Sequence, residues 1–124
     1  MNFFGWFRRR RPQARERVVV TEDEIIRTRP DGATETVRWE DLTEVGIITT
    51  DEGPFVEDVF WILVGADERT GCAVAQGAEG NEELLARLQK LPGFDNEAVI
   101  QAMGSTTNAR FTCWQRPGSL LGNE

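Results

Sequence analysis

The sequence predicts an α+β fold in which an antiparallel β meander or roll of about five to seven strands is followed by two helices and a last strand. Short β-branched and aromatic segments, joined by hairpin-length polar connections, occupy residues 18–75 and favour antiparallel pairing over a doubly wound sheet. Leucines at helical spacing follow between residues 81 and 91, and an alternating pattern returns at residues 110–114.

Six short segments rich in β-branched and aromatic residues are expected to form the first strands, namely residues 18–20, 24–29, 34–39, 45–50, 59–64 and 72–75. Between the second and third, Pro30-Asp31-Gly32 predicts a turn, because proline presets φ and glycine adopts a positive φ without steric cost. Residues 59–64 are apolar throughout and too short to span a membrane. We therefore expect them to form a central strand that is covered on both faces.

Two helices are expected between residues 81 and 104. The first opens with Glu82 and Glu83, which favour the positive end of the helix dipole. Its inner face carries the apolar residues Leu84, Leu85, Leu88 and Leu91, and Leu91-Pro92-Gly93 ends it. The second is expected to be capped by Asp95 or Asn96 and to end near Gly104. Its predicted inward residues are Val99, Ile100 and Met103.

Charge is unevenly distributed along the 124 residues, whose formal net charge is -7. Residues 1–17 hold six arginines against one glutamate, so this segment is strongly basic and the remainder strongly acidic. We expect a disordered basic tail over residues 1–17, one folded domain over 18–116 and a short tail over 117–124. An acidic body repels nucleic acid and attracts proteins with a basic surface.

Catalysis is not indicated by the composition. The chain has no histidine, which excludes Ser-His, Cys-His and histidine–metal sites, and its two cysteines, Cys72 and Cys113, form no CxxC motif. Both cysteines lie in apolar strand patterns and are expected to be small buried hydrophobes. Residues 51–58 lack the alternating oxygen ligands of a calcium loop. We therefore expect no enzyme activity, no cofactor and no metal.

Acidic residues are concentrated between residues 40 and 58 around Gly53-Pro54-Phe55. The candidate partner-binding residues are Glu40, Asp41, Asp51, Glu52, Phe55, Glu57 and Asp58. Such a surface suits a basic protein partner, whose association it would accelerate. A solvated loop that keeps the protein soluble is the alternative interpretation, and both stay open. A tryptophan exposed beside these acids would be a credible binding anchor.

The amino-terminal tail is the second candidate site. Its proposed membrane-binding residues are Phe3, Phe4, Trp6, Phe7, Arg8, Arg9, Arg10 and Arg11. Aromatic side chains favour the membrane interface, and each basic residue near anionic headgroups contributes about 1 kcal/mol. The alternative is a chain end without a role. Because its charges follow a short apolar stretch, the tail resembles no secretory signal. We expect a cytoplasmic protein, with peripheral attachment to the inner face of the membrane as the variant.

Two family resemblances accompany these patterns. Trp39-Glu40-Asp41-Leu42, residues 49–54 and residues 91–96 resemble a family of small uncharacterised bacterial proteins, some of which are similar to immunity proteins of polymorphic toxin systems. This resemblance implies a binder that neutralises a toxin domain by protein contact. Residues 37–45 are similar to bacterial pleckstrin-homology-like domains of the GRAM type. The sequence thus predicts a non-enzymatic protein-interaction domain, with a membrane-surface adaptor as the alternative.

Overall fold

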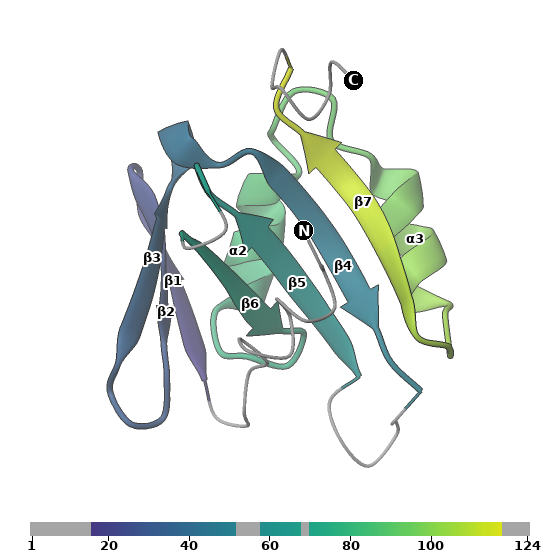
Figure 1. Cartoon of the computed structure of the whole chain (residues 1–124), viewed down its shortest axis with the longest axis horizontal. Coiled ribbons are helices and arrows are strands. Elements are labelled where there is room, and N and C mark those ends of the chain that lie inside the picture. The colour runs from purple at the N-terminus through teal and green to yellow at the C-terminus, as the bar shows by residue number, and fades with distance from the viewer. Residues whose placement is uncertain (1–15, 52–57, 68–69, 118–124) are drawn as a thin grey trace.

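Seven strands in two antiparallel sheets and two α-helices make up the part of the chain that the computed structural model describes, residues 16–51, 58–67 and 70–117 (Figure 1). In chain order the elements are β1 (Arg17–Val20), β2 (Glu24–Thr28), β3 (Thr34–Arg38), the 3-10 helix η1 (Trp39–Asp41), β4 (Glu44–Thr49), β5 (Val59–Val64), β6 (Gly71–Ala75), α2 (Asn81–Leu88), α3 (Asn96–Met103) and β7 (Ala109–Gln115). The predicted α+β class is confirmed, with six strands before the helices and one after them.

The first sheet is a meander of β1, β2 and β3 in that order. Its inner face buries Val18, Ile25 and Val37. The predicted turn joins β2 to β3, where the Gly32 amide donates to the Arg29 carbonyl at 2.9 Å. Gly32 has a φ of 91°, the left-handed conformation that glycine adopts most easily. The turn therefore forms for the reason that the sequence indicates.

The second sheet has the strand order β6-β5-β4-β7, so the last strand returns beside β4 after both helices. Trp61 and Leu63 of β5 face the main core, whereas Phe60 and Ile62 face the opposite side of the sheet. All four are buried. The prediction that residues 59–64 form a central strand covered on both faces is confirmed.

The main core lies between the two sheets and the helices, with α2 packed against β1 and α3 packed against β7 and β4 (Figure 1). Leu84 and Leu88 of α2 are buried in it, as their spacing predicts. At the start of α3 the Asp95 carboxylate accepts a hydrogen bond from the Ala98 amide at 3.1 Å, so Asp95 is the cap. Within the described ranges, neither helix is long and apolar enough to cross a membrane.

The inward face of α3 differs from the prediction. Ala98 and Ala102 face the core, whereas Ile100 is 66% exposed and Met103 is 42% exposed. Two alanines one turn apart allow the helix to lie close to the sheet, and this contact turns Ile100 outward. The prediction that Ile100 and Met103 point inward is therefore wrong, while Val99 does pack against the core.

Among the boundaries that differ from the predicted ones, two bear on the sites described below. Glu16 and Arg17, which the sequence assigned to the tail, belong to the fold, because Glu16 is buried and Arg17 begins β1. Trp39, expected at the end of a strand, instead begins the 3-10 helix between β3 and β4. Both differences arise from contacts with residues distant in the chain, as described below.

Candidate functional site

Strand β4 divides the predicted acidic residues into two groups. Glu40 and Asp41 lie in η1, just before β4, whereas Asp51 and Asp58 lie beyond its opposite end (Figure 1). A strand rises about 3.4 Å per residue, so the two groups are held on the order of 20 Å apart. They do not form one continuous surface.

The other predicted site residues lie outside the described residues. Of the acidic segment these are Glu52, Phe55 and Glu57, and of the tail they are Phe3, Phe4, Trp6, Phe7, Arg8, Arg9, Arg10 and Arg11.

The group at η1 surrounds Trp39, and its position depends on the turn between β1 and β2. The Trp39 amide donates to the Asp23 carbonyl at 3.0 Å, and the Trp39 indole Nε1 donates to the Thr21 carbonyl at 3.0 Å. The Thr21 hydroxyl in turn accepts from the Glu24 amide at 3.0 Å, which shapes the turn. We call Asp23, Trp39, Glu40, Asp41 and Arg87 the Trp39 corner.

Further contacts hold the half-buried indole of Trp39 from other elements. The guanidinium of Arg87, in the last turn of α2, lies over the ring with its carbon 4.2 Å from the ring centroid. Arg116, just after β7, donates to the carbonyls of Trp39 and Leu42, each at 2.8 Å. Nothing in the sequence links Arg87 or Arg116 to Trp39, because only the tertiary fold brings them together.

Both signs of charge lie around Trp39: the carboxylates are Asp23, Glu40 and Asp41, and the guanidinium groups are Arg38, Arg87 and Arg116. Arg38 contacts Glu40 at 2.8 Å, and both side chains are exposed to solvent. The hydrogen bond and the charge of Glu40 raise the pKa of Arg38, and the nearby carboxylates of Asp23 and Asp41 raise it further. Arg87 and Arg116 are partly buried against the ring and the backbone, whereas Asp23, Arg38 and Glu40 are exposed. The exposed carboxylates are the groups of this corner that a cationic partner would contact.

The acidic group at the opposite end of β4 lies beside the α3–β7 connection. The Asp51 amide donates to the Asn108 side chain at 3.3 Å, and the Thr49 hydroxyl donates to the Thr107 carbonyl at 2.7 Å. These contacts tie the connection to the end of β4. They account for the polar residues there as structural contacts.

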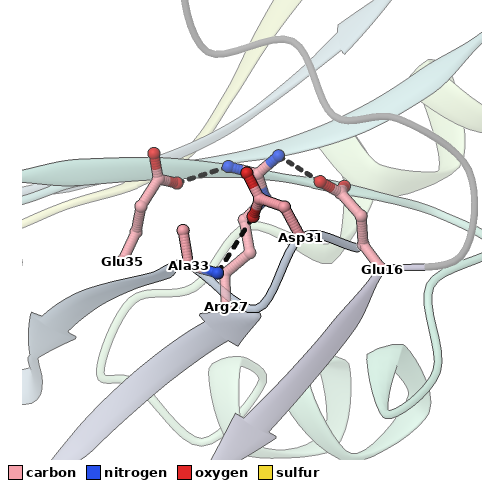
Figure 2. A network of polar contacts seen from close by, with 5 residues as sticks. All are labelled: Glu16, Arg27, Asp31, Ala33 and Glu35. Atoms are coloured by element: carbon pink, nitrogen blue, oxygen red, sulfur yellow. Dashed lines mark hydrogen bonds and ion pairs between the residues drawn. The ribbon is translucent and has the colours of Figure 1, made fainter. Parts of the chain in front are cut away.

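A buried ionic network crosses the first sheet. Figure 2 shows the Arg27 guanidinium between the carboxylates of Glu16 and Glu35, so that one side chain joins residues of all three strands or their ends. Arg27 is only 2% exposed. Burial lowers the pKa of Arg27, but the hydrogen bonds and charges of Glu35 and Glu16 together outweigh this and raise it. The guanidinium is therefore charged, and it explains why Glu16 is drawn into the fold.

A cleft of about 600 Å³ lies next to this network, lined by Glu16, Arg17, Thr28, Arg29, Pro30, Gly32, Gly77 and Glu79. Its lining mixes two acidic with two basic residues. The described lining holds both signs of charge and no aromatic side chain, so the cleft carries no functional assignment.

The cysteines are not reactive groups. Cys72 and Cys113 are free thiols buried in the main core, which confirms their prediction as small buried hydrophobes. Burial, with a smaller contribution from the charge of Asp95, raises the pKa of Cys113 to about 12. Such a thiol is protonated at neutral pH and is a poor nucleophile. Among the described residues no three acidic or cysteine side chains lie close enough to hold a metal ion.

The Trp39 corner is thus the place where the structure brings predicted site residues together with an aromatic side chain. It contains Glu40 and Asp41 of the predicted set and adds Asp23, Trp39 and Arg87. The resemblances to small bacterial proteins and to pleckstrin-homology-like domains stay hypotheses. No protein-family model matches the chain, and neither a curated protein nor a solved structure is significantly similar to it.

Proposed function

We propose that this chain is a non-enzymatic protein-interaction domain that binds a basic protein partner at the Trp39 corner. The observation that supports the proposal is the arrangement of Asp23, Glu40 and Asp41 around a half-buried tryptophan that neighbouring elements hold in place. Tryptophan and arginine are enriched among the residues that contribute most to protein–protein affinity, and a polar rim surrounds them.

The two kinds of residue have different roles in the proposed interface. Exposed carboxylates accelerate association with a cationic surface, and salt weakens this contribution. Trp39 supplies apolar area, and its hydrogen bond to Thr21 reduces the entropy lost on binding because the ring is already oriented. The carboxylates therefore govern the association rate, and Trp39 governs the dissociation rate.

A toxin domain is the form of partner that the sequence resemblance suggests. Neutralisation by contact needs a surface that covers the toxin's functional site, and it needs no catalytic group in the covering protein. The absence of histidine from the chain is compatible with this role. The more general proposal, a basic protein partner, does not depend on it.

The test uses two matched pairs of charge reversals in the full chain. Glu40→Lys with Asp41→Lys alters the Trp39 corner, whereas Asp51→Lys with Asp58→Lys makes the same change in charge at the other end of β4. Proteins captured from a cell extract on the unmodified chain are identified, purified and measured by biolayer interferometry at low and high salt.

The proposal requires that the pair at Trp39 weaken binding by about tenfold or more, mainly through the association rate, while the pair at Asp51 changes it by about twofold at most. An equal loss with both pairs would mean that only overall charge matters. A loss confined to the Asp51 pair would place the interface at the opposite end of the sheet. Either result contradicts the proposal.

The alternative function is a membrane-surface adaptor. Its support is the composition of residues 1–17, where four aromatic side chains precede the arginines. The test is sedimentation of the full chain with anionic vesicles, compared with a full chain in which Phe3, Phe4, Trp6 and Phe7 are replaced by serine. Sedimentation that depends on these aromatics supports the adaptor, and equal behaviour of both chains argues against it.

A further inference from the structure

The second sheet has a buried apolar cluster on the side that faces away from the main core. It consists of Ile48, Phe60, Ile62, Val64, Ala73 and Ala75, which we call the outer cluster. These side chains come from β4, β5 and β6, and none is more than 7% exposed. A cluster this well buried must have a covering layer.

The described elements do not supply this layer. The inner side of the same sheet packs against β1, β2 and β3 and against both helices, whose buried apolar residues belong to the main core. Within residues 16–51, 58–67 and 70–117, no side chain from another element joins the outer cluster. The covering layer therefore comes from elsewhere.

Exposure across the sheet indicates the direction from which the cover comes. On β7, the strand at one edge, Arg110 and Thr112 occupy the same outer side and are exposed. β6 is the strand at the opposite edge, and the small side chains of Ala73 and Ala75 on its outer side are buried. The cover thus extends from the β6 edge over β5 to β4 and stops before β7.

The described chain begins at the β6 edge. The Glu79 amide donates to the Glu16 carbonyl at 3.1 Å, and the Val18 amide donates to the Glu79 carbonyl at 2.9 Å. Glu79 follows the end of β6 by only a few residues. The segment that precedes Glu16 is therefore attached beside the edge from which the cover starts.

We propose that residues 3–7, the aromatic segment at the start of this same chain, pack on the outer cluster. This segment holds Phe3, Phe4, Trp6 and Phe7. The residues between Phe7 and Glu16 can span roughly 30 Å, and three neighbouring strands extend over about 10 Å, so the segment reaches β4 easily. Alanines on β6 leave room for large rings beside Phe60 and Ile62.

The other stretches outside the described residues fit less well. Residues 52–57 join Asp51 to Asp58 at one end of the β4–β5 hairpin, and their sequence holds a single aromatic residue, Phe55. Residues 118–124 follow β7, whose own outer side is exposed, and they carry only two leucines. The aromatic segment is favoured by its attachment point and by its apolar area.

The test is NMR of the full chain with labelled isoleucine methyl groups. Ile48 and Ile62 report on the outer cluster, Ile25 and Ile47 report on the main core, and exposed Ile100 is the reference for solvent contact. We expect nuclear Overhauser effects from the Trp6 indole to Ile48 or Ile62. We also expect protection of both from a soluble paramagnetic probe.

Replacing Phe3, Phe4, Trp6 and Phe7 with serine should increase the relaxation rate that the paramagnetic probe causes at the Ile48 and Ile62 methyl groups. We expect a severalfold increase, towards the rate measured at Ile100. The methyl signals of Ile25 and Ile47 should keep their chemical shifts, which would show that the main core remains folded. The matched control replaces Arg8, Arg9, Arg10 and Arg11 with serine and should leave all five methyl groups unchanged.

Three results would overturn the proposal. The first is the absence of Trp6 contacts in the unmodified chain together with unchanged relaxation in the aromatic variant. The second is contacts that appear only between differently labelled chains in a mixed sample, since these would identify a second copy as the cover. The third is contacts that appear only after anionic vesicles are added, which would favour the membrane adaptor.

Discussion

Arg87 of α2 lies over the indole of Trp39, with 4.2 Å between the guanidinium carbon and the ring centroid. The contact joins the end of α2 to the 3-10 helix between the two sheets. Replacing Arg87 with glutamine should lower the free energy of unfolding by about 1 kcal/mol, because a cation–π contact is lost. Lys90→Gln, an equal change of charge at the same exposed helix end, should lower it by less than about 0.5 kcal/mol.

Urea unfolding followed by circular dichroism measures both changes. Equal effects of Arg87→Gln and Lys90→Gln would show that the charge near the helix end matters and the ring contact does not.

Arg27 should be the most sensitive charged position in the fold. Replacing it with methionine leaves Glu16 and Glu35 without their shared partner in a buried setting, which costs about 3–5 kcal/mol. Arg38→Met removes an exposed ion pair and should lower the free energy of unfolding far less than Arg27→Met does. Denaturant titration of the two variants provides the comparison.

A second variant separates charge from packing at this position. Adding Glu16→Gln and Glu35→Gln to Arg27→Met removes the uncompensated carboxylates and should recover part of the lost stability. If the triple variant is no more stable than Arg27→Met, the loss comes from the cavity or from backbone changes rather than from buried charge.

Gly80 should not tolerate a side chain. Its φ is 90°, and a Cβ atom there would lie 2.0 Å from the Val18 carbonyl oxygen. Gly80→Ala should therefore destabilise the protein by about 3 kcal/mol, from backbone strain and from displacement of β1. Gly93→Ala has a similar φ of 81° but open space around its Cβ, so it should cost only about 1 kcal/mol.

Thermal unfolding of these two glycine variants separates the contributions. A similar loss of stability in both would mean that the left-handed backbone conformation accounts for the whole effect and that the contact with Val18 adds nothing.

Cys113 should remain protonated well above the pH at which an ordinary thiol ionises. Because burial raises its pKa to about 12, the fold favours the neutral thiol, and this contribution to stability is complete below about pH 9 and is lost as pH rises towards 12. In a chain with Cys72→Ala, thiolate absorbance near 240 nm should stay low in the folded protein up to about pH 10, whereas in urea it should rise with a midpoint near pH 9. A midpoint near pH 9 in the folded chain as well would contradict the shift.

Local patterns predicted most of the fold. Alternation located the strands, the apolar run at residues 59–64 marked the central strand, and the alternatives Asp95 and Asn96 marked the start of α3, where Asp95 is the cap. The outward position of Ile100 was not predictable, because which side of α3 faces the sheet depends on how closely Ala98 and Ala102 approach it.

The site was predicted only in part, for a geometric reason. The acids at residues 40–58 are close along the chain, but the buried strand β4 runs between them and places them at opposite ends of the sheet. Arg27 was missed because strand alternation places it inside, and only Glu16 and Glu35, from other strands, make that position favourable. Pairings between distant residues are not encoded in local patterns.

The position of β7 has a consequence for how the protein is made. Its partner β4 pairs Glu44 with Gln115, so one long edge of β4 stays open on the ribosome until residues 109–115 have been synthesised. Until then β4 can pair only with β5. An apolar strand with an open edge is a template for pairing with other chains. The nascent protein therefore depends on rapid closure by β7, or on a chaperone, to avoid aggregation.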